Sequence, residues 1–342
     1  MREPVPPITS TDEKILLAHG SGGRLSHKLI DEVFLRDFDN PILAEKDDGA
    51  IVEIGGEKLA FTTDSYVVKP IFFPGGDIGK LSVWGTVNDL AVMGAEPLYI
   101  SCGLIIEEGL EREILERITS SMAEAARIAN VLVVTGDTKV VERGGADKIY
   151  INTSGVGRVK RDLLLRGIES GDRIILSGSI GEHEISVLLA RGELPFHSQI
   201  VSDLAPLNRL VSEILEVDGV KFIRDPTRGG LATTLNEIAE GVKVGIMVEE
   251  EKIRVSEGVK AVCELLGLDP FYLANEGKMV VVVKGDCAGE VVERMRENPL
   301  GRESEIIGEV VGDLNGRVCL RTMIGGTRIL DMLTGDQLPR IC

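Results

Sequence analysis

Aspartate residues recur in this sequence where apolar segments meet a Gly, Thr or Asn. A single aspartate of this kind is most often a solvated surface group. Mg²⁺, however, is held in proteins by a few carboxylates together with substrate phosphates, so a set of such residues suits a nucleotide with one or more Mg²⁺ ions. The candidate Mg²⁺ ligands are Asp48, Asp64, Asp89, Asp137 and Asp225, and Asn88 is a further candidate contact to the nucleotide.

A glycine-rich loop, AHGSGGRL, directly precedes a segment with helical periodicity. Backbone N–H groups before a helix can hold phosphate oxygens, which makes Gly20, Ser21, Gly22 and Gly23 candidate contacts to a nucleotide. The loop fits neither the G-x-x-x-x-G-K-[ST] pattern nor the G-x-G-x-x-G pattern. An ordinary flexible turn is therefore the alternative interpretation.

Two charged residues could assist phosphoryl transfer and proton removal. Lys139 follows Asp137 at the end of the strand-like segment VLVVTGDTK, where Gly136 and Thr138 are further candidate nucleotide contacts. Strand alternation places Lys139 and Asp137 on one side, either as a plain ion pair or beside a polyphosphate whose charge the lysine offsets. Glu276 stands directly before the apolar strand KMVVVV. It is either an exposed loop acid or a general base whose pKa is raised by partial burial.

The sequence stops on a thiol, Cys342, in the segment GDQLPRIC. From residue 331 onward the chain is too short and too broken by Gly335 and Pro339 to form another helix or strand. An extended chain of eight residues reaches roughly 26 Å, which is enough to carry the thiol into a cleft of its own or of a neighbouring subunit. We therefore expect a mobile tail over residues 331–342 with a reactive cysteine at its tip.

Composition narrows the class of protein. The 342 residues carry a net charge of −17, so nucleic acid is not an expected partner. No apolar run is long enough to span a membrane and the first residues lack a signal-peptide pattern, so a cytoplasmic protein is expected. The five cysteines include no C-x-x-C pair and the four histidines form no spaced set, which argues against a zinc site.

Periodicity predicts alternating helices and strands in both halves of the chain. An arm over 1–13, with three prolines, is expected to be disordered. The pattern restarts near GIESGD, so two domains are predicted, over 14–165 and 166–330. The predicted class is α/β (mixed α+β). In the first half, helices are predicted over 24–38, 78–95 and 111–130, and strands over 58–68, 97–106, 131–141 and 148–159.

Several of these motifs together resemble the carbamoyl dehydratases of hydrogenase maturation, a family in the aminoimidazole ribonucleotide synthetase (PurM-like) superfamily. The resemblance runs from about residue 14 to the last residue, with no departure at the motif positions. It implies a two-domain fold in which the N-terminal sheets of a homodimer pair into a barrel, with ATP in a cleft near the dimer interface. The motifs are AHGSGG, TTDS, VNDLAVMGA, TGDTKVV, RDPTRGG, LANEG, IGEV and the terminal PRIC.

By this resemblance, the expected function is to make the cyanide ligands of nickel-iron hydrogenase. A carbamoyltransferase, HypF, would load the Cys342 sulfur, ATP-dependent dehydration would give a thiocyanate, and a HypC–HypD scaffold would accept the cyanide on iron. Glu276 would be the base, Asn275 would orient the carbamoyl group, and Lys139 with Mg²⁺ would offset phosphoryl charge.

Two other functions remain open at this stage. One is a phosphotransferase of the same superfamily, such as selenophosphate synthetase or thiamine-monophosphate kinase. Selenophosphate synthetase carries a reactive Cys or selenocysteine beside its glycine loop, whereas the first cysteine here is Cys102. The other is a nonenzymatic carrier whose tail tethers a group while nucleotide only regulates docking. A carrier would show no ATP turnover that depends on a loaded tail.

Overall fold

The computed structural model describes residues 14–192, 199–312, 314–333, 338 and 340–342. The predicted arm over 1–13 and part of the predicted tail lie outside these residues. The described chain forms two sheets of five and seven strands, each with its own helices, and a short two-stranded ribbon. The predicted fold class is confirmed.

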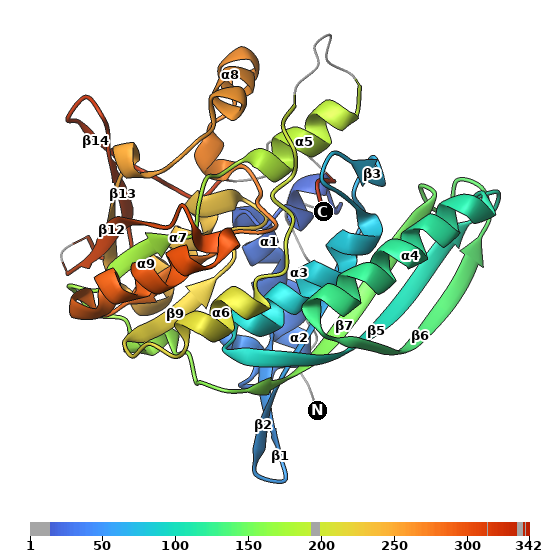
Figure 1. The fold of residues 1–342 in the computed structure, drawn as a ribbon, viewed down its shortest axis with the longest axis horizontal. Helices are drawn as coiled ribbons and strands as arrows, with labels where there is room; N and C mark the ends of the chain where they lie inside the picture. Colours follow the sequence, from blue (N-terminus) through green and yellow to red (C-terminus); the bar gives the residue numbers. More distant parts are fainter. Residues whose placement is uncertain (1–13, 193–198, 313, 334–337, 339) are drawn as a thin grey trace, which may run out of the picture.

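The five-stranded sheet of the first half is antiparallel except at one edge, where β5 and β6 run parallel. Helices α3 (Ile78–Val92) and α4 (Arg112–Ala129) cover one face of it (Figure 1). The Asp77 carboxylate accepts the Gly79 and Lys80 N–H groups and so begins α3. The strands are, in order across the sheet, β1 (Ala50–Ile54), β2 (Glu57–Tyr66), β7 (Ile149–Val159), β5 (Ala95–Glu107) and β6 (Leu132–Val141).

The other face of this sheet keeps apolar side chains exposed. Phe61 on β2 pairs in register with Val156 on β7, which in turn pairs with Tyr99 on β5, so these three residues share one face. Phe61 and Tyr99 are exposed. An apolar sheet face of this kind is typical of a protein interface.

The central strands of the seven-stranded sheet of the second half are buried on both faces. Successive residues Ile174 and Ile175 of β8 belong to different apolar clusters, one containing α7 and the other containing α6 and α9. This two-sided burial explains the uninterrupted apolar run of β11. The strand order is β14 (Thr327–Ile329), β13 (Val318–Arg321), β10 (Gly245–Glu249), β12 (Glu305–Val311), β8 (Arg173–Leu176), β11 (Val280–Val283) and β9 (Val220–Arg224).

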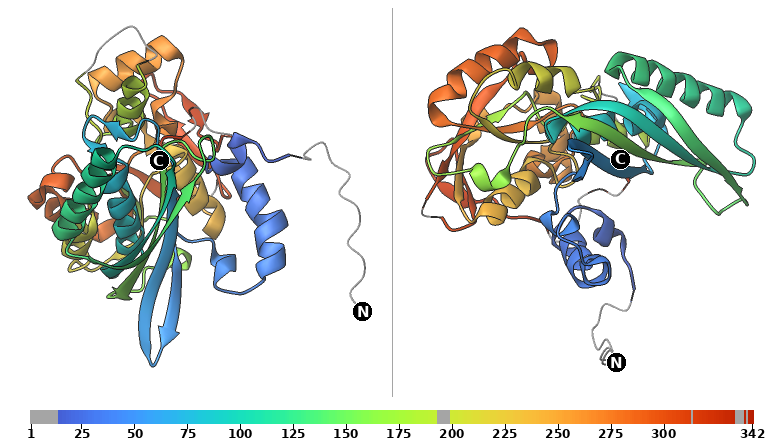
Figure 2. Two further views of the ribbon diagram at one scale, coloured as in Figure 1. Left: turned by 90° about the vertical axis from the view of Figure 1, so that its right-hand side faces the viewer. Right: turned by 90° about the horizontal axis from the view of Figure 1, so that it is seen from below.

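Most predicted elements are present, with several short ones added. The predicted helix over 24–38 forms α1 (Arg24–Leu29), a π-helical stretch η2 (Ile30–Leu35) and α2 (Arg36–Phe38). Figure 2 shows this segment on the opposite side of the five-stranded sheet from α4. The remaining helices are α5 (Glu182–Ala190), α6 (Asn208–Ile214), α7 (Gly230–Val242), α8 (Glu257–Leu266) and α9 (Ala288–Glu297), and the ribbon is β3 (Phe72–Phe73) with β4 (Gly76–Asp77).

None of the helices within the described ranges combines the length and the apolar character needed to cross a bilayer.

Candidate active site

A cavity of about 520 Å³ lies where the first-half sheet, the helical segment 24–38 and the second half meet. Its acidic side is formed by four of the predicted aspartates and by Glu276, and Cys342 lies on its wall. Its apolar side comes from the helical segment and the loop that follows. The lining includes Gly22, Ile30, Phe34, Phe38, Asp48, Asp64, Asp89, Arg224, Asp225, Arg228, Glu276 and Cys342.

The acidic residues reach this cavity from different elements. Asp48 precedes β1, Asp64 lies within β2 and Asp89 lies within α3. Asp225 follows β9, and Glu276 comes shortly before β11. Asp48 and Glu276, more than two hundred positions apart in the sequence, therefore line one cavity.

Asp48 is tied to the second half of the chain by Arg224, which donates from Nε and Nη2 to Asp48 Oδ1 at 3.0 and 2.9 Å. Burial raises the pKa of Asp48 to about 6, although the charge of Arg224 acts in the opposite direction. The second oxygen, Oδ2, is buried and has no hydrogen-bond partner among the residues that the structure describes. A buried carboxylate oxygen in this state suits a cation or a donor on a ligand.

Burial and mutual repulsion also act on the other carboxyl groups. Burial, and next the charge of Asp48, raises the pKa of Asp225 to about 7. Burial raises the pKa of Asp89 well above its usual range, with the charge of Asp225 as the next cause. Thr62 donates to Asp89 Oδ2 at 2.9 Å, which opposes that rise. Carboxyl groups that repel one another in this way suit a site that receives positive charge.

These residues suit a Mg²⁺ ion that is bound together with a phosphate ligand rather than one held by protein side chains alone. Among the described residues, no group of three or more His, Cys, Asp or Glu side chains is arranged to hold a metal ion. Mg²⁺ usually takes one or two carboxylates and completes its shell with substrate phosphates and water. Asp48, with its unpartnered buried oxygen, and the crowded Asp89 and Asp225 are suitable carboxylates.

Glu276 is buried rather than an exposed loop acid. Burial raises its pKa well above the usual range, and the charges of Asp225 and Asp203 raise it further. Its backbone is held on both sides, because its N–H donates to Asp203 Oδ1 at 3.2 Å and its carbonyl accepts from Asn88 Nδ2 at 3.1 Å. A fixed carboxylate whose pKa is raised is a stronger base than an exposed one.

Asn88 and Asn275 support the site from outside the cavity wall. Asn88 also donates to the Ala205 carbonyl and accepts from Leu207 N–H. Asn275 is fully buried and uses its amide on the backbone of three residues: it accepts from Gly181 N–H and donates to the carbonyls of Pro226 and Leu273. Both amides therefore position the loops that carry the acidic residues.

Arg224 and Arg228 lie in the cavity but were not among the predicted site residues. Arg228 Nη2 lies 4.0 Å from Asp64 Oδ1, and the negative charge at Cys342 is the largest cause that raises the pKa of its guanidinium. The motif RDPTRGG contains this residue, and its two arginines close to an aspartate could have indicated a role for them in the site. An arginine facing several acids suits phosphate recognition.

The glycine loop reaches the cavity through Gly22. This residue has φ +78°, and a Cβ on it would lie 2.9 Å from Arg228 Cβ, so glycine is required by both conformation and packing. Ser21 is buried and donates to the Ala18 carbonyl. Gly23 precedes α1, and a Cβ on Gly20 would meet no atom within 4 Å.

The segment Gly136–Lys139 is not brought to this cavity by its own chain. These residues lie exposed on the edge strand β6, and Lys139 Nζ pairs with Asp137 Oδ2 at 2.9 Å. The ion pair lowers the pKa of Asp137. Within one chain, the predicted roles of Gly136, Asp137, Thr138 and Lys139 in nucleotide binding therefore have no geometric support.

The end of the chain is docked against the first half. Val67 N–H donates to a main-chain oxygen of Cys342 at 3.1 Å, and Lys69 N–H donates to the Arg340 carbonyl at 3.2 Å. Ile341 is buried in the apolar cluster of the first half. Figure 1 shows the C-terminus beside α5 and β3. The tip of the tail thus enters the cleft of its own chain.

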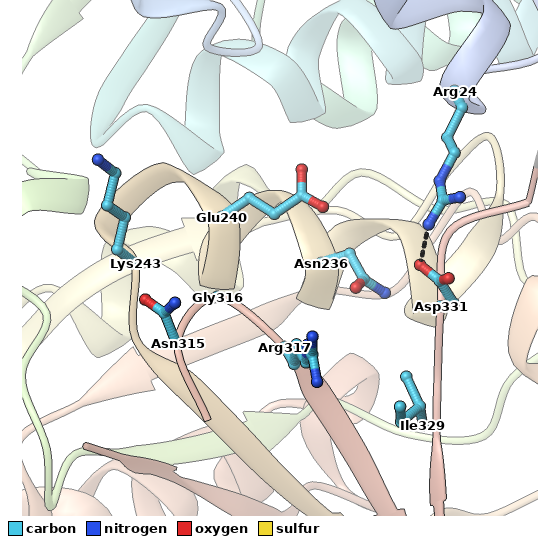
Figure 3. A pocket seen from close by; sticks show the side chains of 9 residues that line it. All are labelled: Arg24, Asn236, Glu240, Lys243, Asn315, Gly316, Arg317, Ile329 and Asp331. Atoms are coloured by element: carbon cyan, nitrogen blue, oxygen red, sulfur yellow. Dashed lines mark hydrogen bonds and ion pairs between the residues drawn. The ribbon is translucent and has the colours of Figure 1, made fainter. Parts of the chain in front are cut away.

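A second cavity, of about 710 Å³, lies over the start of the tail (Figure 3). Arg24 of α1 forms an ion pair with Asp331 there, and its backbone N–H donates to the Leu333 carbonyl at 2.9 Å. Asn236 donates to the Leu330 carbonyl at 2.8 Å. These contacts fix the base of the tail to α1, the helix that follows the glycine loop, and to α7.

Known proteins share this arrangement. The family model of the AIR synthase related protein N-terminal domain matches residues 46–159, and that of the C-terminal domain matches 169–320. Carbamoyl dehydratase HypE of Cupriavidus necator is 49% identical over 340 residues, which cover 98% of this chain and 97% of that protein.

Two solved structures agree with this result. A crystal structure of a HypE–HypF complex matches with a TM-score of 0.85 at 47% identity, over 89% of this chain and 99% of that chain. HypE in complex with ATP matches with a TM-score of 0.81 at 49% identity, over 96% of this chain and 100% of that chain. The chain belongs to the AIR synthase related family and, within it, to the carbamoyl dehydratases named HypE.

Proposed function

We propose that this protein uses ATP to dehydrate a carbamoyl group carried on the Cys342 sulfur, giving a thiocyanate that supplies cyanide to a nickel-iron hydrogenase. The observation that carries this proposal is that Cys342 lies in the same cavity as Glu276 and four aspartates. The 49% identity to carbamoyl dehydratase HypE over nearly the whole chain supports the same reaction.

The proposed ATP site is the cavity of about 520 Å³. Exposed apolar side chains on its helical side, Ile30, Phe34 and Phe38, suit a purine base. Arg228 and the glycine loop suit the phosphates. When bound, Mg²⁺ would offset the phosphate charge, with Asp48, Asp64, Asp89 and Asp225 as its available carboxylates. HypE itself has been crystallised with ATP.

The dehydration takes place in two balanced steps. The carbamoyl oxygen attacks the γ-phosphorus, the bond from that phosphorus to ADP breaks, and one N–H proton leaves, giving an S-linked imidate phosphate. The C–O bond then breaks, phosphate departs with its electron pair, and loss of the second N–H proton leaves S–C≡N. Phosphorylation is needed because an amide oxygen is otherwise a poor leaving group.

Glu276 is the proposed base for these protons. Its burial and its acidic neighbours raise its pKa, so it can take up a proton from nitrogen and pass it on to the departing phosphate. Asn275 was expected to orient the carbamoyl group. Because its amide is already used by three backbone groups, we propose that it acts by fixing the loop that carries Glu276.

Lys139 and Asp137 are proposed to act across a homodimer. The exposed face with Phe61 and Tyr99, and the exposed edge strand β6, suit the pairing of two first-half sheets. Such pairing would carry Lys139 toward the nucleotide of the second subunit, where it would offset phosphoryl charge.

The proposed partners are the carbamoyltransferase HypF, which loads the thiol, and a HypC–HypD scaffold, which accepts the cyanide on iron. A structure of HypE bound to HypF supports the first of these. The predicted location is the cytoplasm, where these partners would meet the protein.

Intact-protein mass spectrometry tests the proposal. The protein is incubated with HypF, carbamoyl phosphate and MgATP, and the expected record is a mass gain of one carbamoyl group followed by the loss of one water. Glu276→Gln should load normally and retain the water. If the parent protein gains the carbamoyl group but never loses water, the result would support the alternative of a nonenzymatic carrier. ATP turnover with a small acceptor and an unloaded tail would support the phosphotransferase.

A further inference from the structure

We propose that α5 and the residue after it form a dock that recognises the main chain of the tail, with His183 and Arg191 holding the carbonyls of residues 341 and 340. This dock positions the Cys342 sulfur for dehydration. The proposal rests on the proposed function, because the positioned group is the carbamoyl group on that sulfur.

Two backbone hydrogen bonds align the tail with residues 67–69. Val67 N–H donates to a main-chain oxygen of Cys342 at 3.1 Å, and Lys69 N–H donates to the Arg340 carbonyl at 3.2 Å. The carbonyl of Ile341, between these two bonds, lies against a donor on α5 instead.

His183 is that donor. Its Nε2 lies 3.2 Å from the Ile341 carbonyl oxygen, and its Nδ1 lies 2.8 Å from Ser202 Oγ. Ser202 Oγ already accepts the N–H of Leu204 at 3.1 Å, so its own hydrogen is available to Nδ1. This network assigns a neutral ring with its hydrogen on Nε2, aimed at the tail.

Arg191 joins the two sides of this pairing. Its Nη2 donates to the Arg340 carbonyl at 3.2 Å, and its Nε donates to the Lys69 carbonyl at 3.1 Å. The side chain thus bridges the tail and the strand-like segment that receives it. His183 and Arg191 bind main-chain carbonyls, which are present in every amino-acid sequence. They therefore fix the position of the tail without selecting its side chains.

Two side chains of the tail make the dock specific for the sequence of the tail. Ile341 is buried in the cluster that contains Phe73 and Val187. Arg340 donates to the Val67 carbonyl at 3.1 Å and pairs with Asp147 at 2.8 Å. A tail with a polar residue at position 341 would lose the buried contact while keeping its backbone bonds.

The dock separates the two stages of the reaction. Loading by a partner enzyme requires the thiol to be reached from outside, whereas dehydration requires it to be held beside Glu276. The main-chain oxygens of Ile341 and Cys342 are both held by hydrogen bonds, so the carbamoyl group on the Cys342 sulfur is held at one position. Dehydration then becomes a unimolecular step. Weakening the dock should therefore slow only the second stage.

His183→Leu and Arg191→Met test this inference in the full-length protein. Carbamoyl loading by HypF should be unchanged or faster, and loss of water should slow about tenfold, as expected for one lost hydrogen bond. His183→Gln, which keeps a donor, should recover part of the rate. Arg209→Met is the matched control, since Arg209 is an exposed arginine on α6 paired with Glu213.

Alkylation of Cys342 by iodoacetamide, located by peptide mapping, gives a readout that needs no ATP chemistry. The dock variants should react about tenfold faster than the parent, because the thiol spends more time undocked. If they react and lose water at the parental rates, the dock is refuted. The parent protein could load carbamoyl and never lose water while the dock variants still alkylate faster than the parent. That result would refute the proposed reaction and support the dock.

The buried His183→Leu substitution could prevent folding, so a second route uses the tail alone. Ile341→Ser alters no residue of the folded body outside the tail. Compared with the parent, Ile341→Ser should accept the carbamoyl group at the normal rate, lose water more slowly and react faster with iodoacetamide, as the dock variants should. Parental rates for Ile341→Ser together with parental rates for Arg191→Met would overturn the inference.

Discussion

Arg224 donates two hydrogen bonds to a single oxygen of Asp48, at 2.9 and 3.0 Å, and so joins the two halves of the chain at the cavity. The two side chains are only 12% and 15% exposed. Arg224 also lies 3.4 Å from Glu237, which in turn contacts His27 of α1. One guanidinium therefore holds the loop before β1, the helix α7 and, indirectly, the helix after the glycine loop.

Arg224→Leu should destabilise the protein by about 3 kcal/mol at pH 8, because it leaves Asp48 buried without its cation. The loss should be smaller at pH 5, where Asp48 can be neutralised by a proton. Urea unfolding at the two pH values measures this. Arg209→Leu, which removes an exposed arginine, is the control and should cost less than about 1 kcal/mol at either pH.

Stability without ligand should fall as the pH rises from about 4 to about 7. Asp225 has its pKa raised to about 7 by burial, so the folded state binds that proton more tightly than the unfolded state. The stabilising contribution is therefore present at low pH and is lost as the pH rises through the folded pKa.

Comparison of Asp225→Asn with the parent isolates this effect from other groups. The variant should melt at least roughly 2–4 °C higher than the parent at pH 8 without Mg²⁺ or nucleotide, and the difference should shrink toward pH 4. Added MgATP should raise the melting temperature of the parent more than that of the variant. A difference that does not change with pH would contradict the raised pKa.

Gly22→Ala should weaken ATP binding several-fold while the fold is retained. A side chain at φ +78° is strained by about 1–2 kcal/mol, and its Cβ would press on Arg228 at 2.9 Å. Titration calorimetry with MgATP measures the change. Gly55→Ala is the matched control, because Gly55 also has positive φ but lies in the β1–β2 turn with no atom near its Cβ position. Equal ATP affinity in both variants would exclude the contact with Arg228 as a determinant.

The position of Lys139 can be tested by subunit complementation. Lys139→Ala and Glu276→Gln should each be nearly inactive in dehydration. If Lys139 serves the neighbouring subunit, co-expression should restore about a quarter of the parental rate, since half of the dimers are mixed and each mixed dimer has one complete site. No recovery in verified mixed dimers would place Lys139 in the site of its own chain or outside the reaction.

Periodicity predicted the long elements because their packing is simple. The helix predicted over 111–130 buries one side, with Ile118, Met122 and Ala126 in the apolar cluster of the first half, so local pattern and tertiary structure agree. Helix α5 escaped prediction because its first turn buries His183 and Glu184, two polar residues that break an apolar stripe. Those same residues now serve the tail and the loop before β11: Glu184 accepts from Ala274 N–H at 2.6 Å.

The aspartates of the acidic side were selected from the sequence, although the structure places Asp64 within β2 and Asp89 within α3 rather than at segment ends. Arg228 was missed although the motif RDPTRGG contains it, because its contact with Gly22, some two hundred residues away, exists only in the folded chain. The tail dock was also beyond sequence reasoning, because Ile341 is buried by residues from several separated segments. Pairings of this kind are properties of the assembled fold.

The attachment of the tail base to Arg24 sets a limit on how far the thiol can travel. Leu333 is held by the Arg24 backbone, and nine residues, 334 to 342, follow it. A chain of that length spans at most roughly 30 Å, so Cys342 stays inside a sphere of that radius. Every enzyme that loads or unloads the sulfur must bring its own catalytic groups within this sphere. Once bound there, it meets the thiol at an effective concentration on the order of millimolar, whatever the protein concentration in the cell.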